Sequence, residues 1–337
     1  MKQIDRIISS DPAALAFAEE GDITDDVEYR RLHIGSGQHG FRIDKALVDV
    51  LPEFSRSYLQ QLIEAGRVQL QSVVVSKSSL KVKAGEALLV ELHPTPQSQA
   101  FRPEAMALRV VFEDAHLLVI DKPAGLVVHP APGNWSGTLL NGLLAHDPVM
   151  AQVPRAGIVH RLDKDTSGLM VVAKTRLVMD SLVQAIAARD VARQYFAVAH
   201  KPWSRPARTT VEAAIGRDPR NRLRMAVVNL ESSHGKTAKT DVILLDDGSK
   251  GCLVRCILHT GRTHQIRVHM AHLEHPLVGD VVYGGAVVPE MARQALHACR
   301  LAFEHPVTHA PMIFDSAPPE DFQRLISSWG LSYNRQL

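Results

Sequence analysis

The residues best suited to chemistry stand in one short stretch near the middle of the chain. It reads His160-Arg161-Leu162-Asp163-Lys164-Asp165-Thr166-Ser167-Gly168. Three side chains that are or can become cationic and two carboxylates lie within six positions. An apolar segment precedes them, and the apolar run after the Thr-Ser-Gly turn predicts a buried strand. A solvated surface turn would also hold these charges, but a charge between two buried segments is costly without a partner. The position therefore favours a functional site.

The motifs His160-Arg161-Leu162-Asp163 and Thr166-Ser167-Gly168 resemble the signature of the RluA family of RNA pseudouridine synthases. Two further blocks match this family, one from Asp121 to Pro130 and one from Leu258 to Met270. The resemblance extends over roughly residues 41–325 and is strongest to the members that modify large-subunit (23S) ribosomal RNA. It implies an enzyme that isomerises specific uridines to pseudouridine and needs no cofactor.

The resemblance also implies three catalytic residues, which are Asp163, Tyr195 and Arg267. Isomerisation breaks the N-glycosidic bond of a uridine and rejoins the base through carbon, so one ionised carboxylate must act at the ribose. The residues leave open whether Asp163 attacks the anomeric carbon or acts as a base at the 2′ position. An adjacent Arg267 would keep this carboxylate ionised and oriented. The ring of Tyr195 could stack on the uracil, and its phenol could relay the proton from C5.

Further contacts with RNA are expected because the target base must leave its stack before it can react. The family implies that the arginine of the central motif, Arg161, fills the gap. The imidazole of His160 is also suited to stack there. Lys122, in the block that begins at Asp121, is expected near RNA, although a structural role fits its position as well. His160 and Arg161 are therefore expected on the RNA-facing side of the site.

Strands and a helix are expected to carry these residues. The alternation over Val191–His200 predicts a strand that contains Tyr195. A second strand, Cys252–Leu258, ends in a Thr-Gly turn. Thr263 can cap the helix that follows, which carries Arg267 and ends at about His272. On the second strand the cysteines share one face with apolar residues, which indicates core positions and not metal ligands.

Residues 41–92 are expected to form a small RNA-binding module. Apolar residues at helical spacing predict a first helix, Ser55 can cap a second that ends at Gly66, and short strands follow. The stretch resembles the S4 RNA-binding domain, which implies RNA contacts by the basic residues Arg42, Lys45, Arg56 and Arg67. One hairpin carries Gln71-Ser72 where the family usually has Asn-Gly. Because a tight type I′ turn needs positive φ at both residues, we expect this turn to be reshaped.

The chain is expected to divide into four parts. Residues 1–40 form an acidic, flexible N-terminal extension, residues 41–92 the S4-like module, residues 93–103 a linker and residues 104–337 the catalytic domain. The resemblance implies an α+β catalytic domain with a long mixed, mostly antiparallel sheet, flanking helices and the site in a central cleft. The smaller module would be an α/β S4 domain. The helical and strand patterns agree with this architecture.

The composition fits a folded protein with a polyanionic partner. Of the 337 residues, 45% are apolar and 22% charged, and no apolar run approaches the length of a membrane span. The start lacks the long apolar stretch of a secretory signal, so we expect a soluble, cytoplasmic protein. The net charge of +2 becomes an excess of six bases once residues 1–31, with eight acids and four bases, are set aside. A basic body of this size suits RNA.

No metal centre is expected. His269, His272 and His275 are evenly spaced, but no glutamate stands at the position that it has in the motif of a zinc peptidase. Three cysteines in a chain of this length argue against a disulfide framework. The expected partner is ribosomal RNA or a pre-ribosomal large subunit, bound by a monomer without a membrane.

Other functions remain compatible with the residues. The target could be another ribosomal site or tRNA. A non-catalytic RNA-binding or ribosome assembly factor could keep this fold, although the presence of Asp163, Tyr195 and Arg267 argues against it. A glycosidase usually needs a second carboxylate across the sugar, and Asp165 would have to supply it.

Overall fold

The computed structural model describes residues 27–93, 100–221 and 224–332 of the chain. The chain divides into two compact units, Met1–Thr95 and Pro96–Leu337. Most of the predicted acidic extension, residues 1–26, and much of the predicted linker, residues 94–99, lie outside the described residues. Within the described ranges, no helix is long and apolar enough to cross a membrane.

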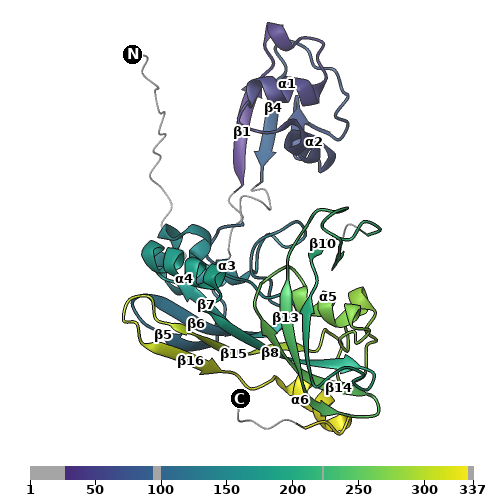
Figure 1. The fold of residues 1–337 in the computed structure, drawn as a ribbon. Coiled ribbons are helices and arrows are strands. Elements are labelled where there is room, and N and C mark those ends of the chain that lie inside the picture. The colour runs from purple at the N-terminus through teal and green to yellow at the C-terminus, as the bar shows by residue number, and fades with distance from the viewer. Residues whose placement is uncertain (1–26, 94–99, 222–223, 333–337) are drawn as a thin grey trace. The chain divides into compact units, whose positions relative to one another are not determined.

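The first unit packs two helices against a four-stranded antiparallel sheet of order β1-β4-β2-β3 (Figure 1). Its elements are β1 (Glu28–His33), the 3-10 helix η1 (Ser36–Gln38), α1 (Ile43–Val50), α2 (Arg56–Glu64), β2 (Val68–Leu70), β3 (Val73–Val75) and β4 (Ala87–Leu92). Ser55 caps α2, as predicted, because its hydroxyl accepts a hydrogen bond from the Tyr58 amide at 3.3 Å. Gly66, with φ +72°, follows the end of this helix.

The folded first unit extends further toward the N-terminus than residue 41, where the S4-like module was predicted to begin. Strand β1 pairs with β4 along its whole length, from Glu28 opposite Leu92 to His33 opposite Ala87. Ile34, directly after the strand, is buried in the core of the unit. These residues therefore belong to the folded unit and not to a flexible extension. The strand was missed because an edge strand carries charged side chains on its exposed face, as in Glu-Tyr-Arg-Arg.

The turn at Gln71-Ser72 also differs from the prediction. Leu70 pairs with Val73, so two residues connect β2 and β3, and their φ angles are +51° and +65°. The tight hairpin is kept even though glycine and asparagine adopt this conformation more readily. Pairing of β2 with β3 on one side and β4 on the other holds the two residues there. Such conformations cost on the order of 1–3 kcal/mol each.

The second unit contains a nine-stranded mixed sheet of order β5-β6-β7-β15-β8-β14-β13-β9, with β16 paired to β15. Its strands are β5 (Val110–Glu113), β6 (Leu117–Lys122), β7 (Ser167–Ala173), β8 (Ala192–His200), β9 (Arg208–Glu212), β13 (Lys239–Asp247), β14 (Gly251–Leu258), β15 (Leu296–Glu304) and β16 (Pro311–Asp315). Every pairing in it is antiparallel except that of β7 with β15. The predicted α+β fold with a long, mostly antiparallel sheet is confirmed.

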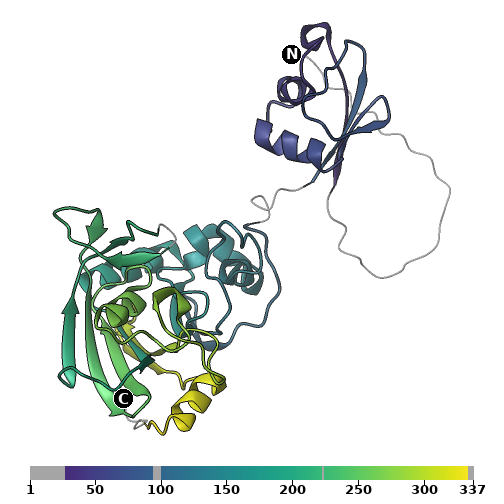
Figure 2. The same cartoon turned by 90° about the vertical axis from the view of Figure 1, so that its right-hand side faces the viewer.

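Helices cover both faces of this sheet. They are α3 (Leu139–His146), α4 (Arg176–Ala188), α5 (Gln265–His272) and α6 (Glu320–Ser328). Along β6, Leu118 and Ile120 join a core that includes α3 and α5, whereas Leu117 and Val119 join a core that includes α4. Helix α6, yellow in Figure 2, packs in a further core with Phe196 and its neighbours on β8. The alternation along the strands thus places α3 and α5 opposite α4.

Short elements complete the second unit. They are the 3-10 helices η2 (Pro148–Gln152), η3 (Pro154–Gly157) and η4 (Val281–Tyr283) and a small separate sheet of β10 (Ile215–Arg217), β11 (Met225–Val227) and β12 (Gly235–Lys236). The two cysteines of β14, Cys252 and Cys256, are fully buried in the core shared with α3 and α5, as the strand alternation predicts.

Candidate active site

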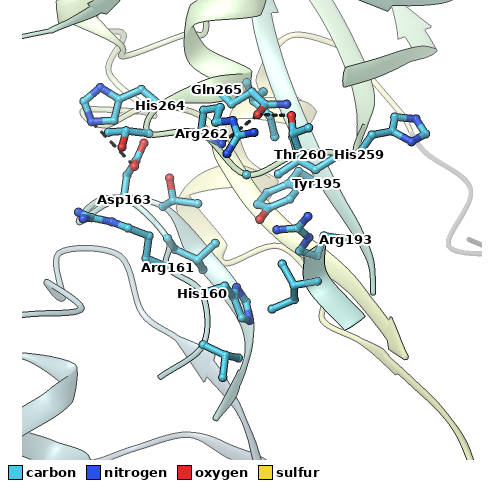
Figure 3. A pocket seen from close by; sticks show the side chains of 18 of the residues that line it. His160, Arg161, Asp163, Arg193, Tyr195, His259, Thr260, Arg262, His264 and Gln265 are labelled. Carbon is cyan, nitrogen blue, oxygen red and sulfur yellow. Dashed lines mark hydrogen bonds and ion pairs between the residues drawn. The ribbon is translucent and has the colours of Figure 1, made fainter. Parts of the chain in front are cut away.

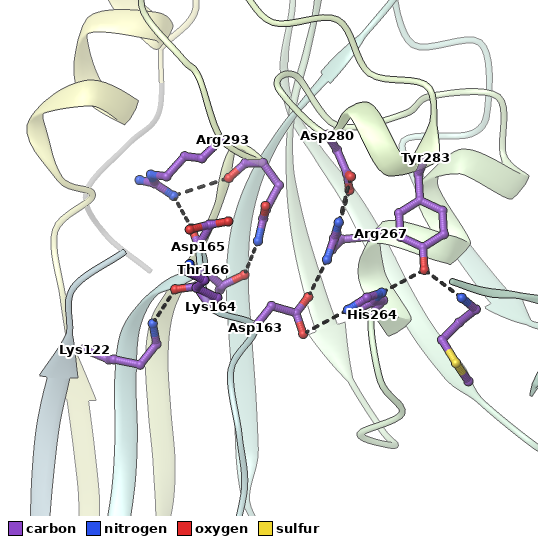
Figure 4. Close-up of polar contacts among 12 residues, drawn as sticks. Lys122, Asp163, Lys164, Asp165, Thr166, His264, Arg267, Asp280, Tyr283 and Arg293 are labelled. Carbon is purple, nitrogen blue, oxygen red and sulfur yellow. Dashed lines mark hydrogen bonds and ion pairs between the residues drawn. The ribbon is translucent and has the colours of Figure 1, made fainter. Parts of the chain in front are cut away.

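The central motif forms the loop that leads into β7, and two side chains from the segment just before β15 hold this loop. Nη1 of Arg293 donates to the carbonyl of Asp165 at 2.9 Å, and Nε2 of Gln294 donates to the hydroxyl of Thr166 at 3.3 Å (Figure 4). Leu162 anchors the loop in the apolar core. The loop is thereby fixed on both sides of Asp163, whose side chain remains 15% exposed.

Lys122 is buried, which fits the structural role that its position also allowed and not the expected place near RNA. Its side chain is buried, and its ammonium donates hydrogen bonds of 2.8–2.9 Å to the carbonyls of Pro123, Leu126 and Lys164. Burial lowers the pKa of Lys122 to about 7, while the two carboxylates of the central motif act to raise it. The three carbonyls match the three N–H bonds of the protonated form. Lys122 therefore ties the end of β6 to the loop of the central motif.

The structure brings Asp163 and Arg267 together. Nη1 of Arg267 donates to Oδ2 of Asp163 at 3.1 Å. The opposite edge of the guanidinium is held by Asp280, which accepts from Nε at 2.6 Å and from Nη2 at 2.8 Å. Burial acts to lower the pKa of Arg267, but the two carboxylates outweigh it and raise the pKa. Asp280 thus fixes the plane of the arginine and leaves one edge for Asp163.

The helix that carries Arg267 begins differently from the prediction. Helix α5 starts at Gln265, and its N-cap residue is His264, with φ +56° and no side-chain cap. Thr263, the predicted N-cap residue, does not cap this helix. Instead Oε1 of Gln265 accepts from the Arg262 amide at 2.9 Å and from the Thr260 hydroxyl at 2.8 Å. The longer side chain reaches back over the turn and satisfies groups that the shorter threonine does not reach.

His264 and Tyr283 lie beside Asp163 and contact each other (Figure 4). The phenol oxygen of Tyr283 accepts from the Met225 amide at 3.1 Å, so its proton can be donated to Nδ1 of His264, 2.8 Å away. Nε2 of His264 then carries a proton and faces Asp163 at 3.9 Å. Burial lowers the pKa of His264, and Asp163 acts in the opposite direction. The ring of Tyr283 also lies 5.0 Å from the guanidinium of Arg267, within cation–π range.

Asp163, Tyr195 and Arg267 line one pocket of about 620 Å³. Figure 3 shows Asp163 and Tyr195 in it. This volume is in the range of sites for small molecules and would admit a single extruded nucleotide. Tyr195 is 5% exposed, and burial raises the pKa of its phenol to about 12, with Arg193 opposing and Asp163 adding to the shift. The phenol therefore keeps its proton at neutral pH. Asp165 is not among the residues that line the pocket.

His160 and Arg161 also line the pocket, but the His160 side chain is held by a hydrogen bond whereas Arg161 is exposed. Nε2 of His160 accepts a hydrogen bond from the Val171 amide at 3.1 Å, which fastens the imidazole to β7. Burial lowers the pKa of His160 to about 3, and the charge of Arg193 adds to this effect. The imidazole of His160 is therefore neutral and held against β7. Arg161 is exposed, so of the two it is the one free to move into a gap in RNA.

Several residues of the site were not predicted from the sequence. They are Asp280, His264, Tyr283, Arg293 and Arg193. Asp280 and Tyr283 stand in a stretch that matches the family, but nothing in their spacing shows that they meet Arg267. Arg193 offered a usable signal. It lies two residues before Tyr195 on a strand, so both side chains point to the same face, and an arginine on a buried face needs an explanation.

The basic residues predicted to bind RNA in the first unit all make contacts within it. Arg42 and Arg56 hold the buried carboxylate of Asp44, at 3.1 Å and 2.8 Å. Lys45 lies 4.0 Å from the centre of the Phe41 ring, and Arg67 donates to Glu91 at 2.9 Å. The side chains of Arg42, Arg56 and Arg67 are still 45–55% exposed, so they retain a solvent-facing surface.

Family models match both units. Residues 116–272 match the RNA pseudouridylate synthase family, and residues 41–88 match the S4 domain. Two solved human structures share the fold of the second unit. RNA pseudouridylate synthase domain containing 1 aligns with a TM-score of 0.50 at 24% identity, over 68% of this chain and 97% of that one. For domain containing 4 the TM-score is 0.52 at 22% identity, over 66% and 94%.

Curated relatives match almost the whole chain. A ribosomal large subunit pseudouridine synthase D from Neisseria meningitidis serogroup A is 46% identical over 93% of this chain and 87% of its own length. Proteins of the same name from Nitrosomonas europaea and Xanthomonas campestris are each 45% identical, over 86% and 90% of this chain and 84% and 93% of their own. The fold is that of an enzyme that isomerises uridine in RNA. The chain belongs to the RNA pseudouridylate synthase family.

Proposed function

We propose that this enzyme converts specific uridines of large-subunit ribosomal RNA to pseudouridine in the cytoplasm, with Asp163 as the essential carboxylate. The arrangement of Asp163 carries the proposal. It lies in a pocket of nucleotide size, 3.1 Å from an arginine that Asp280 holds in place. A carboxylate placed and oriented in this way is ready to act at a ribose that enters the pocket.

The pocket residues divide the reaction between sugar and base. Asp163 acts at the ribose, as nucleophile at C1′ or as base at the 2′ position, and Arg267 stabilises and aims its negative charge. The ring of Tyr195 stacks on the uracil. Because burial raises the pKa of its phenol to about 12, Tyr195 is better suited to hand on a proton than to remove one unaided.

Entry of the base requires extrusion from its stack, which leaves a gap in the RNA. Arg161 is exposed at the pocket and carries a flat guanidinium that can stack where the base was. His160 is fastened to β7 and shapes the pocket wall. We therefore assign the gap-filling role to Arg161 alone.

The choice of ribosomal RNA rests on the relatives and on the first unit. The curated relatives are named for the ribosomal large subunit and match both units of this chain. We propose that residues 28–93 dock the enzyme on structured RNA, while residues 100–332 carry the catalytic site, and that the enzyme acts as a monomer without a metal or other cofactor. Mapping pseudouridines in ribosomal RNA from cells with and without the protein tests the choice. Loss of pseudouridine from tRNA alone would contradict it.

Asp163→Asn tests the catalytic assignment. The amide keeps the shape of the side chain but removes the charge, so turnover should fall on the order of 10⁴-fold. RNA affinity should stay nearly unchanged. The matched control is Asp165→Asn, which alters a carboxylate outside the pocket and should keep measurable activity. Equal loss in both variants would favour a mechanism with two carboxylates, as in a glycosidase. An active Asp163→Asn would overturn the assignment of Asp163, and wild type without isomerase activity would favour a non-catalytic RNA-binding protein.

A further inference from the structure

Arg193 is a buried cation that the reaction, as described so far, does not use. It projects from β8 and is 5% exposed. Its Nε is buried without a hydrogen-bond partner, and Arg193 forms no ion pair with any of the described residues. Of the arginines that line the pocket, only Arg193 and Arg267 are buried, and Arg267 holds two carboxylates. Burying a guanidinium without a partner carboxylate costs free energy, so its presence here indicates that it binds an anionic group of a ligand.

The surroundings of Arg193 aim it at the pocket (Figure 3). Its guanidinium lies beside the phenol of Tyr195, and the charges of both Arg193 and Asp163 act on that phenol. Gly261 leaves the room that the guanidinium occupies, because a Cβ at this position would stand 2.9 Å from Nη1 of Arg193. His160 is neutral and cannot compete with it for an anion. Arg193 is thus held at the wall where Tyr195 would stack on the uracil.

We propose that Arg193 is a further catalytic residue, which stabilises the negative charge that develops on the uracil when the C1′–N1 bond breaks. The inference rests on the proposed function. Whether Asp163 attacks C1′ or removes the 2′ proton, the electron pair of the broken bond stays on the base and spreads over N1, O2 and O4. The same base then forms the C1′–C5 bond and loses the C5 proton, while N1 gains one. No outside reactant is needed.

The charges of the pocket differ between the end that would hold the sugar and the end that would hold the base. The sugar end holds Asp163 and Asp280 around Arg267, a net charge of −1. The base end holds the unpaired Arg193. A positive charge fixed in a site that excludes water stabilises an anion more strongly than the same charge in solvent, and it needs no reorganisation during the reaction. The charge is not neutralised in the free enzyme because its counter-charge appears only as the glycosidic bond breaks.

The first test compares Arg193→Met with wild type under single turnover, with enzyme in saturating excess over a stem-loop RNA that contains a mapped target uridine. Loss of one donor to a developing anion lowers such rates by about 100–1,000-fold, so we expect a loss of this size. RNA affinity and its salt dependence should be unchanged. Arg193→Lys, which keeps the charge, should recover part of the rate. Arg255→Met is the control, because this arginine of β14 also has an unpaired Nε but does not line the pocket.

The second test replaces the target uridine by 5-fluorouridine in the same RNA. Fluorine withdraws electrons and stabilises the base anion, so cleavage should depend less on Arg193. Disappearance of the starting nucleoside reports this step. We expect the loss in Arg193→Met to be at least about tenfold smaller on the fluorinated RNA than on the natural one.

Thermal melts of the full-length variants without RNA separate a catalytic from a structural role. Removal of an unpaired buried charge should leave the melting temperature unchanged or raise it by a few degrees. A clear drop in melting temperature would show that Arg193 has a structural partner and would overturn the inference. Weaker binding with a flatter salt dependence, at an unchanged saturating rate, would show a phosphate contact and overturn it as well. Wild type that leaves uridine unconverted refutes the proposed function too, whereas active wild type with an equally active Arg193→Met refutes only the role of Arg193.

Discussion

At the scale of single residues, the role of each buried arginine follows from its partner. Arg267 has two carboxylates and orients one of them, Arg293 holds the backbone of the central motif, and Arg193 has an open position for an anion. All three are arginines, and at most about an eighth of each is exposed, 5% for Arg193, 6% for Arg267 and 12% for the Arg293 side chain. Only the neighbours, which come from distant parts of the chain, distinguish an orienting residue from a structural or catalytic one.

The two carboxylates that contact Arg267 should contribute differently to stability and to activity. Asp280→Asn should leave a buried guanidinium poorly paired and lower the free energy of unfolding by about 3 kcal/mol. Turnover should fall too, because Asp280 fixes the edge of Arg267 that meets Asp163. Asp163→Asn leaves the Asp280 pair intact and should unfold close to wild type. Denaturant unfolding of both variants measures this, and a larger destabilisation by Asp163→Asn would contradict the assignment.

Asp44 predicts the acid sensitivity of the first unit. Burial acts to raise its pKa, but hydrogen bonds from Arg56, Arg42 and Gln60 outweigh this and lower the pKa to about 2 from 3.8. A carboxyl whose pKa is lowered by folding contributes stability above the unfolded value, and this contribution is lost as pH falls from about 3.8 to about 2. The loss should be about 2 kcal/mol. Unfolding of residues 27–93 between pH 5 and 2 measures it.

Asp44→Asn should remove most of that pH dependence. Asp49→Asn provides the matched control, because Asp49 is exposed on the same helix and forms no ion pair with a described residue. The explanation fails if both variants retain the acid transition of the wild-type unit.

At the scale of elements, β7 illustrates how a glycine sets the position of the catalytic loop. Gly168 has φ +115°, and a Cβ there would lie 2.2 Å from the carbonyl oxygen of Ala298 on β15. This is the single parallel pairing of the large sheet, and it directly follows the central motif. The Thr-Ser-Gly sequence, which reads as a turn, is therefore also a contact between two strands.

Gly168→Ala should destabilise the second unit by about 3 kcal/mol or more, because a backbone clash adds to an unfavourable φ. Gly125→Ala separates the two effects, since Gly125 has φ +87° but nothing within 4 Å of the added carbon. Its cost should be about 1 kcal/mol. Denaturant midpoints of the two variants measure the difference, and equal midpoints would remove the argument for close packing of β7 on β15.

The sequence predicted those features of the elements that depend on nearby residues. Strands β3 and β4 and the Ser55 cap follow from local pattern and chemistry. Edge strand β1 was missed because its charges hide the alternation, and the Gln71-Ser72 turn was misjudged because flanking pairing overrides local preference. The pairing of Asp163 with Arg267, 104 positions apart, came from resemblance alone. Asp280 and Arg193 were not predicted because the spacing of residues along the chain does not show which side chains meet in the folded structure.

At the scale of the whole molecule, the two units are suited to different parts of the task. The second unit contains the pocket and all four proposed catalytic residues, including Arg193. The first has its own core and exposed basic side chains but contributes no residue to the pocket. Docking on RNA and chemistry on a uridine can therefore be altered one at a time.

Deletion of residues 1–99 should separate these two activities. The second unit should remain folded when it begins at Ala100, because Asn141 binds the carbonyls of Ala100 and Arg102 and needs both. The saturating single-turnover rate on a short stem-loop should be unchanged. Affinity for a long ribosomal RNA fragment should fall. Its logarithmic salt dependence should flatten by about 0.7–0.9 for each phosphate that the shortened protein no longer neutralises.

A surface variant of the intact chain provides the control for that deletion. Arg42 and Arg56 are unsuitable because both hold Asp44, so their removal would disturb folding as well as docking. Lys77 and Lys83 are exposed and form no ion pair with a described residue. Replacement of both by Gln should weaken binding to the long RNA in the same direction but less than the deletion does, with melting unchanged. If the truncated chain binds the long fragment as tightly as the full chain, with the same salt dependence, the first unit does not dock the enzyme.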